Sequence, residues 1–239
     1  MSSPDYKESQ IIDWLNDDIK PQNLSKLYDR DYINYTGSPA DNKNIFYSDL
    51  IAKYLIDRLY LFNNDQIKEI ARKDYGNGHY IQEDHKQLGD EAKSLPYTTE
   101  DQFAKFLYNS ELESLGKIID FQTPIGDKSF GAVDLLAYNR EEILSLVELK
   151  WKDSKETMLR AILEICTYFC QINKKQLEEE LKKNGMSPNI KKTRKAVLVF
   201  EESPLFEHYK KTKLIDNLAT KLEVEIFFLN GSTVKFKKQ

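Results

Sequence analysis

The sequence has little of what membrane-bound or secreted proteins need. Its 239 residues contain no apolar run of about 18, the length that spans a bilayer. The first ten residues, MSSPDYKESQ, are too polar for a secretory signal. The two cysteines, Cys166 and Cys170, are spaced i,i+4 in a helical pattern, which argues against a disulfide between them. We therefore expect a cytoplasmic protein without membrane contact.

Signatures of several enzyme classes are also absent. The sequence has no P-loop, no G-x-S-x-G and no dinucleotide-binding fingerprint. Its three histidines, His79, His85 and His208, do not have the spacing of metal ligands. The net charge is −4, so contact with nucleic acid would need a local basic surface. The chain does contain 14 Tyr and 12 Phe, and these supply ample material for a core.

The hydrophobic pattern divides the chain into two parts. Residues 1–95 are rich in Tyr and Asp and mainly helical in spacing, and we interpret them as a recognition or capping region. From residue 97, strand-length apolar runs alternate with helical stripes in the order α-β-β-β-α-β-α-β-β. One long helix is expected over about 155–183. The pattern predicts a domain at 96–239 with a mixed α/β sheet whose helices cover both faces.

The stretch 130–151, FGAVDLLAYNREEILSLVELKW, is the most informative part of the sequence. Residues 133–138 and 143–149 are short runs rich in Leu, Val and Ile. Such runs, bounded by turn residues, are typical of buried strands. A polar loop joins them, so together they predict a hairpin.

Three charges interrupt or close these two runs. Asp134, Glu148 and Lys150 belong to residue types that are rarely buried without a partner. Glu148 and Lys150 share one face of their strand because side chains repeat every two residues. Asp134 lies opposite Glu148 if Tyr138 pairs with Leu144. That register requires an odd number of loop residues or a bulge.

Two chemical interpretations of these charges are open. The carboxylates of Asp134 and Glu148, with the main-chain carbonyl of Leu149, form a hard oxygen site that suits Mg²⁺ or Mn²⁺. A metal there lowers the pKa of a bound water and neutralises charge on a phosphodiester, while the Lys150 ammonium orients that water. The alternative is a buried Asp–Lys–Glu ion pair with a structural role only.

The same residues resemble the signature of the PD-(D/E)xK nuclease superfamily. Residues 131–137 read GAVDLLA, similar to G-x-[VI]-D-L-L-A in its RecB-like and archaeal-type endonuclease branches. Residues 144–150 read LSLVELK, similar to [VIL]-x-L-V-E-L-K. The resemblance covers about residues 97–238. It implies a restriction-endonuclease-like fold with an α-β-β-β-α-β core, and metal-dependent nuclease activity.

The resemblance also implies further site residues. Superfamily members usually carry one more acid on the first helix, for which Glu100 fits best and Glu111 is the second choice. An ordinary helix N-terminal acid is the alternative for Glu100. Many relatives have Q-x-x-x-Y on the helix after the lysine. That position here reads Glu164 to Tyr168, a departure at the first residue, with a solvated helix face as the alternative. Gln122 is a further candidate, or else an exposed strand residue.

A basic segment precedes the fourth strand. Lys191, Lys192, Arg194 and Lys195 are candidates for contact with a phosphate backbone, or else members of an ordinary solvated loop. The leading hypothesis is a Mg²⁺-dependent (or Mn²⁺-dependent) nuclease acting on DNA, with RNA left open as a substrate and a homodimer as one arrangement. The second hypothesis is a catalytically inactive module of the same fold that binds nucleic acid or a protein partner.

Overall fold

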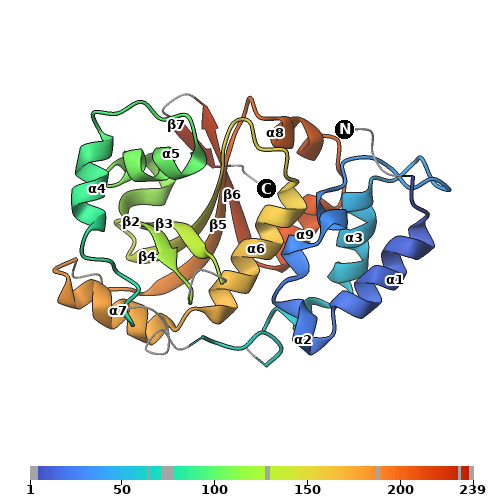
Figure 1. The fold of residues 1–239 in the computed structure, drawn as a ribbon, viewed down its shortest axis with the longest axis horizontal. Helices are drawn as coiled ribbons and strands as arrows, with labels where there is room; N and C mark the ends of the chain where they lie inside the picture. Colours follow the sequence, from blue (N-terminus) through green and yellow to red (C-terminus); the bar gives the residue numbers. More distant parts are fainter. Residues whose placement is uncertain are drawn as a thin grey trace.

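The centre of the molecule is a mixed β-sheet whose strand order follows the sequence (Figure 1). The computed structural model describes residues 5–63, 65–70, 78–126, 130–186, 189–230 and the backbone of 233–236. Within these residues the strands are β1 (Glu111–Leu112), β2 (Gly116–Pro124), β3 (Ala132–Tyr138), β4 (Ile143–Lys150), β5 (Lys192–Phe200), β6 (Val224–Asn230) and β7 (Thr233–Phe236).

Strand directions follow from the connections between the strands. The neighbours from β1 to β4 are antiparallel and are joined by short loops. β5 lies parallel to β4, and β6 lies parallel to β5, because helical crossovers connect them. β7 returns antiparallel to β6. The expected mixed α/β sheet is therefore confirmed.

Helices precede, connect and cover these strands. They are α1 (Glu8–Asp18), α2 (Pro21–Leu24), α3 (Tyr47–Ile56), α4 (His85–Ala92), α5 (Glu100–Leu107), α6 (Met158–Gln171), α7 (Lys174–Lys183), α8 (Pro204–Tyr209) and α9 (Ile215–Lys221), with 3₁₀ turns at η1 (Leu27–Asp29), η2 (Asp31–Asn34), η3 (Leu59–Phe62) and η5 (Glu113–Leu115). None of these helices is both long and apolar enough to cross a bilayer.

The expectation of one helix over 155–183 is wrong. The chain forms α6 and α7, because Ile172 adopts an extended conformation between them. Asn173 then begins a new helix, and its side-chain oxygen accepts a hydrogen bond from the Gln176 amide at 2.7 Å. Asn is a preferred N-cap residue, so a local side-chain bond competes here with helix continuation.

Helices cover both faces of the sheet (Figure 1). On one face α6 packs against β4 and β5, and α1, α3 and α9 form one apolar cluster with it. On the other face α5 packs against β2, β3 and β4, with α4 beside it. A second apolar cluster fills the space beneath α5. The sheet is thus buried on both sides, which explains the nearly continuous apolar runs of β4 and β5.

The N-terminal region shares a core with the helix that covers the first of these faces. Ile33, Ile51 and Leu55 are fully buried in the same apolar cluster as Ile162 of α6. Thr157, the N-cap of α6, donates its hydroxyl to the Ile33 carbonyl at 2.7 Å. The regular elements described in this region are helices and 3₁₀ turns, and several of them form part of the layers that cover the sheet.

Candidate active site

The hairpin register places Asp134 and Glu148 at the same level. Tyr138 pairs with Leu144, and the ladder continues to Leu135 and Val147, so Asp134 and Glu148 occupy the next position. The loop between the first pair, residues 139–143, has the odd number of residues that this register requires. The register prediction is confirmed.

Side-chain bonds hold Asp134 in place at this level. Its Oδ2 accepts a hydrogen bond from the Leu149 amide at 2.8 Å, and its Oδ1 accepts one from Gln122 Nε2 at 2.8 Å. Gln122 lies on β2 at the position opposite Asp134 of β3, with a positive φ of 46°. Gln122 therefore points into the site as a positioning residue and is not an exposed strand residue.

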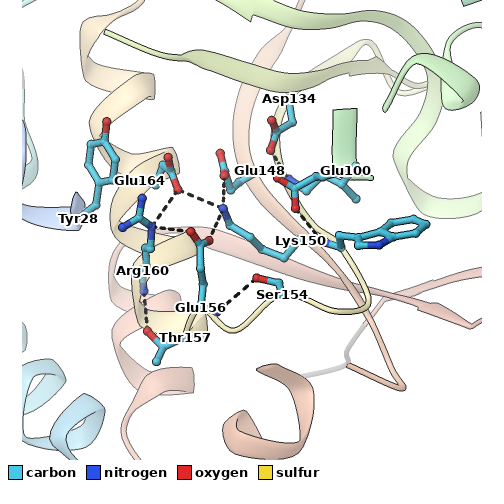
Figure 2. Close-up of polar contacts among 12 residues, drawn as sticks. Tyr28, Glu100, Asp134, Glu148, Lys150, Ser154, Glu156, Thr157, Arg160 and Glu164 are labelled. Carbon is cyan, nitrogen blue, oxygen red and sulfur yellow. Dashed lines mark hydrogen bonds and ion pairs between the residues drawn. The ribbon is translucent and has the colours of Figure 1, made fainter. Parts of the chain in front are cut away.

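The Lys150 ammonium lies at the centre of the cluster (Figure 2). Its Nζ is 2.7 Å from Glu148 Oε1, 2.6 Å from Glu156 Oε2 and 3.2 Å from Glu164 Oε2. Lys150 and Glu148 are only 4% and 3% exposed, so these contacts are shielded from solvent. Strand periodicity directs both side chains toward α6, where Glu164 lies.

Helix α6 presents two further residues to the site. Glu164 and Tyr168 lie one turn apart, and the Tyr168 hydroxyl donates to Glu164 Oε1 at 3.0 Å. Both are buried, so the alternative of a solvated helix face is wrong. Gly131 lies against the same hydroxyl: a Cβ added there would come within 2.3 Å of it, and φ is +82°. The glycine of the GAVDLLA segment thus makes room for Tyr168.

The helix acid at the site is Glu100. It is the first residue of α5, which Thr99 caps, and its Oε2 accepts a hydrogen bond from the Trp151 amide at 2.7 Å. Glu111, the second choice, is an exposed residue of the short strand β1, paired with Lys117. The structure brings Glu100, and not Glu111, to the cluster.

Sequence reasoning missed three residues of the cluster. Glu156 contacts Lys150, and Arg160 Nε lies 3.0 Å from Glu156 Oε1. The hydroxyl of Tyr28, from the N-terminal region, lies 3.4 Å from that of Tyr168. The spacing of Glu156, Arg160 and Glu164, four residues apart, was a usable signal. No local signal connects Tyr28 with a helix that begins at residue 158.

Acidic side chains outnumber cationic ones in this cluster. The carboxylates are Glu100, Asp134, Glu148, Glu156 and Glu164, and the cations are Lys150 and Arg160. Burial raises the pKa of Asp134 to about 7. Burial, with the Asp134 carboxylate next in importance, raises the pKa of Glu148 well above its ordinary value.

Burial and the neighbouring charges also shift the pKa values of Lys150, Glu100 and Glu164. Burial disfavours the Lys150 ammonium, but Glu148, Glu164 and Glu156 outweigh it and raise the pKa of Lys150 well above its ordinary value. Burial raises the pKa of the Glu100 carboxyl as well. Burial also opposes the charge of Glu164, yet the Lys150 ammonium is the main group that holds its pKa below the usual range. The cluster would be stabilised by one more cation.

The cluster offers carboxylate oxygens as donor atoms for a metal ion. In the part of the chain that the structure describes, no group of three or more His, Cys, Asp or Glu side chains is arranged to hold one. Glu148 Oε2, however, is buried and has no hydrogen-bond partner among the described residues. A carboxyl oxygen without a donor beside Asp134, in a site where acidic groups outnumber cationic ones, suits a hard divalent cation. In charge and donor chemistry the residues fit.

The basic segment lies at the opposite end of the sheet from this cluster. Lys192 pairs with Ile143 at the start of β4, whereas Lys150 at its end pairs with Val199. The two ends of β4 are about 23 Å apart at the usual rise of a strand. Strand β5 runs parallel to β4, and this direction separates the basic residues from the carboxylates.

The members of this segment differ in their surroundings. Lys191 and Lys192 are exposed, and Lys191 forms an ion pair with Glu142. Lys195 Nζ lies 5.1 Å from the centre of an aromatic ring of α6. The guanidinium of the buried Arg194 donates to Ser145 Oγ at 2.6 Å, to Glu225 at 2.7 Å and to the Ser114 carbonyl at 3.0 Å. Arg194 therefore stabilises the sheet and does not present its charge to a ligand.

No protein-family model, no curated protein and no solved structure matches this chain. Its function is therefore inferred from the geometry of the cluster around Lys150.

Proposed function

We propose that this protein is a Mg²⁺-dependent nuclease of the PD-(D/E)xK type that hydrolyses phosphodiester bonds in DNA. The observation that carries the proposal is the convergence of Asp134 and Glu148, from adjacent strands, with Lys150 at the carboxyl end of β4. These are the residues on which the resemblance rests. Chance spacing in the sequence does not require them to meet in space.

The arrangement of elements supports the same proposal. Helix α5, the antiparallel strands β2, β3 and β4, the crossover helix α6 and the parallel strand β5 follow one another in the order α-β-β-β-α-β. This is the order that the resemblance implies for a restriction-endonuclease-like core. We propose that fold for the part of the chain from α5 onward.

Asp134, Glu148 and the Leu149 carbonyl would hold the metal, with Glu100 as a further ligand through water. When bound, Mg²⁺ or Mn²⁺ supplies an acidified water and neutralises charge on the phosphodiester. The excess of carboxylates in the cluster supports this assignment, because a divalent cation would compensate it. Asp134 and Glu100 are already oriented by main-chain or amide donors, and Glu148 is oriented by the Lys150 ammonium, so little rearrangement of the backbone is needed.

The other residues of the cluster have assisting roles. Lys150 orients the attacking water and stabilises the negative charge of the pentavalent transition state. Glu164 holds the Lys150 ammonium, and Tyr168 in turn orients Glu164. Gln122 fixes the carboxylate of Asp134. Glu164, Tyr168 and Gln122 would thus support the catalytic residues through hydrogen bonds.

Contact with DNA through Lys191, Lys192 and Lys195 stays part of the proposal at longer range. Lys192 is about 23 Å from the cluster, which corresponds to about seven base pairs of duplex, whereas Lys195, which pairs with Leu146, is about 13 Å from it. Only a substrate that extends along the sheet reaches both places. The homodimer and the cytoplasmic location stay predictions.

Cleavage assays on point variants test the proposal. Wild type, Asp134→Ala and Lys150→Ala are incubated with plasmid, single-stranded and branched DNA in Mg²⁺ or Mn²⁺. We expect wild type to cleave and each variant to lose activity by a factor on the order of 100 or more. Lys20→Ala, which removes an exposed lysine paired with Asp17, is the control and should cleave as wild type does. No cleavage by wild type, or equal cleavage by all variants, would refute the proposal.

One observation favours the second hypothesis, a catalytically inactive module of the same fold. Lys150 is bound to three carboxylates, and one of them, Glu164, stands where many relatives of the proposed family carry glutamine. Thermal unfolding during a Mn²⁺ titration separates the two hypotheses. A catalytic site should be stabilised by Mn²⁺ in a saturable way that Asp134→Ala abolishes. An inactive module should show no such stabilisation.

A further inference from the structure

An aromatic pocket lies beside the carboxylate cluster, on the α5 face of the sheet. Its volume is about 460 Å³, within the range of sites for small molecules. The aromatic residues that line it are Tyr97, Phe103, Phe106, Trp151 and Phe200. None of the roles described above uses this pocket.

The rings of the pocket form a continuous set. The centroid of Tyr97 is 4.6 Å from that of Phe106 and 5.0 Å from that of Phe103. The Trp151 centroid is 5.3 Å from that of Phe103 and 5.1 Å from that of Phe200. Tyr97 is 40% exposed, so an aromatic surface reaches solvent. The Trp151 indole N–H is buried without a hydrogen-bond partner among the described residues.

The pocket and the carboxylate cluster are built from the same segments. Trp151 directly follows Lys150, and its amide donates to Glu100. Glu100 and Phe103 are three residues apart on α5 and therefore share one face of that helix. The strand end thus presents Lys150 to the cluster and Trp151 to the pocket, and α5 presents Glu100 to the cluster and Phe103 to the pocket. A ligand that passes over the carboxyl edge of the sheet can contact both.

The charges around the pocket define what part of such a ligand enters it. Glu111 and Glu202, both exposed, line it and repel a phosphate group. Lys152 Nζ lies 5.3 Å from the centre of the Trp151 ring, and Lys93 Nζ lies 5.1 Å from the centre of the Phe106 ring, so two cations offset these two acids. With these charges offset, the aromatic side chains dominate the lining, and an aromatic ring suits it because it stacks on them.

We propose that the pocket binds an unstacked nucleobase of single-stranded DNA whose phosphate lies at the carboxylate cluster. This inference rests on the proposed nuclease function and adds the class of substrate to it. Aromatic side chains that bind single strands stack on the faces of the bases and accept every base. Bases inside an intact duplex are stacked and paired, so the pocket favours single strands, frayed ends and flaps.

Tryptophan fluorescence tests this binding without any need for catalysis. Trp14 and Trp151 are the two tryptophans of the chain, so the full-length Trp14→Phe variant reports on Trp151 alone. It is titrated in EDTA with a short single-stranded DNA, with the same strand carrying abasic residues, and with a blunt duplex of equal length. We expect saturable quenching by the intact single strand and at least tenfold weaker binding of the other two.

Point variants locate the binding to the pocket. Tyr97→Ala in the Trp14→Phe background should weaken binding of the single strand roughly tenfold, because stacking energy is lost. Tyr60→Ala is the control, since Tyr60 is 59% exposed outside the pocket, and should leave binding unchanged. Circular dichroism verifies that both variants are folded.

The outcomes of these experiments distinguish the two proposals. Absence of quenching, equal binding of the abasic strand, or unchanged binding by Tyr97→Ala overturns the pocket assignment, even if the protein cleaves DNA. Quenching with the expected losses supports the pocket. If the same protein then fails to cleave in Mg²⁺ or Mn²⁺, the nuclease proposal falls and a single-strand-binding pocket remains.

Discussion

Hydrogen bonds hold the Asp134 carboxyl group in place, but its buried position disfavours its charged form. Both of its carboxylate oxygens accept hydrogen bonds, from the Leu149 amide and from Gln122. Burial nevertheless disfavours the charged form of Asp134 and raises its pKa to about 7. A structural ion pair would be expected to balance its charges, whereas an acid kept in excess among other acids is typical of a functional site. The resulting loss of stability is the usual cost of such a site.

Replacing Asp134 by Asn should stabilise the metal-free protein at neutral pH. The unfolded chain releases the Asp134 proton near pH 4, while the folded protein keeps it until about pH 7. The free energy of unfolding of the wild type therefore falls by up to about 4 kcal/mol as pH rises from about 4 to about 7. The Asn variant has no titrating group at this position, so its free energy of unfolding does not fall for this reason. Urea unfolding in EDTA at several pH values should show the variant gaining on wild type as pH rises.

Asp101→Asn is the matched control for this experiment. Asp101 is an exposed acid on α5, paired with Lys105 at the surface, so its replacement should change stability little at any pH. A stability difference between Asp134→Asn and wild type that does not vary with pH would contradict the expectation. It would mean that Asp134 is already ionised in the folded protein.

At the scale of elements, the break between α6 and α7 affects how α6, which carries Glu164, lies across the sheet. Helix α6 ends at Gln171, and the following residue, Ile172, forms a bridge with Ile70 of the N-terminal region. The chain then turns into α7, whose N-cap Asn173 also donates a hydrogen bond from its side-chain amide to Glu69 Oε1 at 2.7 Å. A single straight helix would lose both contacts. The break therefore fixes how α6, with its Glu164, lies across the sheet.

Asn173→Ala should lower the free energy of unfolding by about 1 kcal/mol, the usual value of an N-cap. The substitution removes the oxygen that accepts from the Gln176 amide. Asn173→Ser is the control: it keeps a capping oxygen and loses only the exposed amide bond to Glu69, so most of the stability should be retained. Chemical denaturation measures both variants. Equal stability of Asn173→Ala and wild type would show that the cap does not stabilise the break.

At the scale of the whole molecule, the N-terminal region completes both the core and the site. Its residues Ile33, Ile51 and Leu55 share an apolar cluster with α6. Asp29 binds Arg160 at 3.1 Å, and Tyr28 lies against Tyr168. The division at residue 95 follows the change in sequence pattern, but apolar packing continues across it.

Residues 96–239 produced alone should therefore fail to fold cooperatively. Each Ile or Leu side chain that becomes exposed to water lowers the free energy of unfolding by about 1.5–3 kcal/mol. Several such losses together exceed the roughly 5–15 kcal/mol that stabilises a typical domain. Thermal unfolding followed by circular dichroism measures this. Residues 1–95, added as a separate polypeptide, should restore a cooperative transition. If 96–239 unfolds cooperatively by itself, the shared core is not essential.

Much of the central hairpin was predictable. Strand side chains alternate with a period set by the backbone, so the shared face of Glu148 and Lys150 followed from their spacing. The register followed from one assumption, that Tyr138 pairs with Leu144, and the loop of residues 139–143 satisfies it. Such features depend on neighbours within a few residues, and a sequence displays those directly.

Side chains that look equivalent in the sequence were not predictable individually. Lys192 and Arg194 belong to one basic segment, yet Lys192 is exposed and Arg194 is buried with three partners. The two residues share one face of β5, so strand alternation does not distinguish them. Arg194 is buried because Ser145 and Glu225, on the neighbouring strands, bind its guanidinium.

The sequence by itself determined the mixed α/β class, the central hairpin and the register of its acids, because short-range periodicity and loop length control all three. Only the tertiary structure decided which distant groups join them. It selected Glu100 over Glu111, added Glu156 and Tyr28, and placed the basic segment at the far end of the sheet. The physical reason is that these contacts depend on strand direction and helix packing between segments far apart in the chain, which no local pattern encodes.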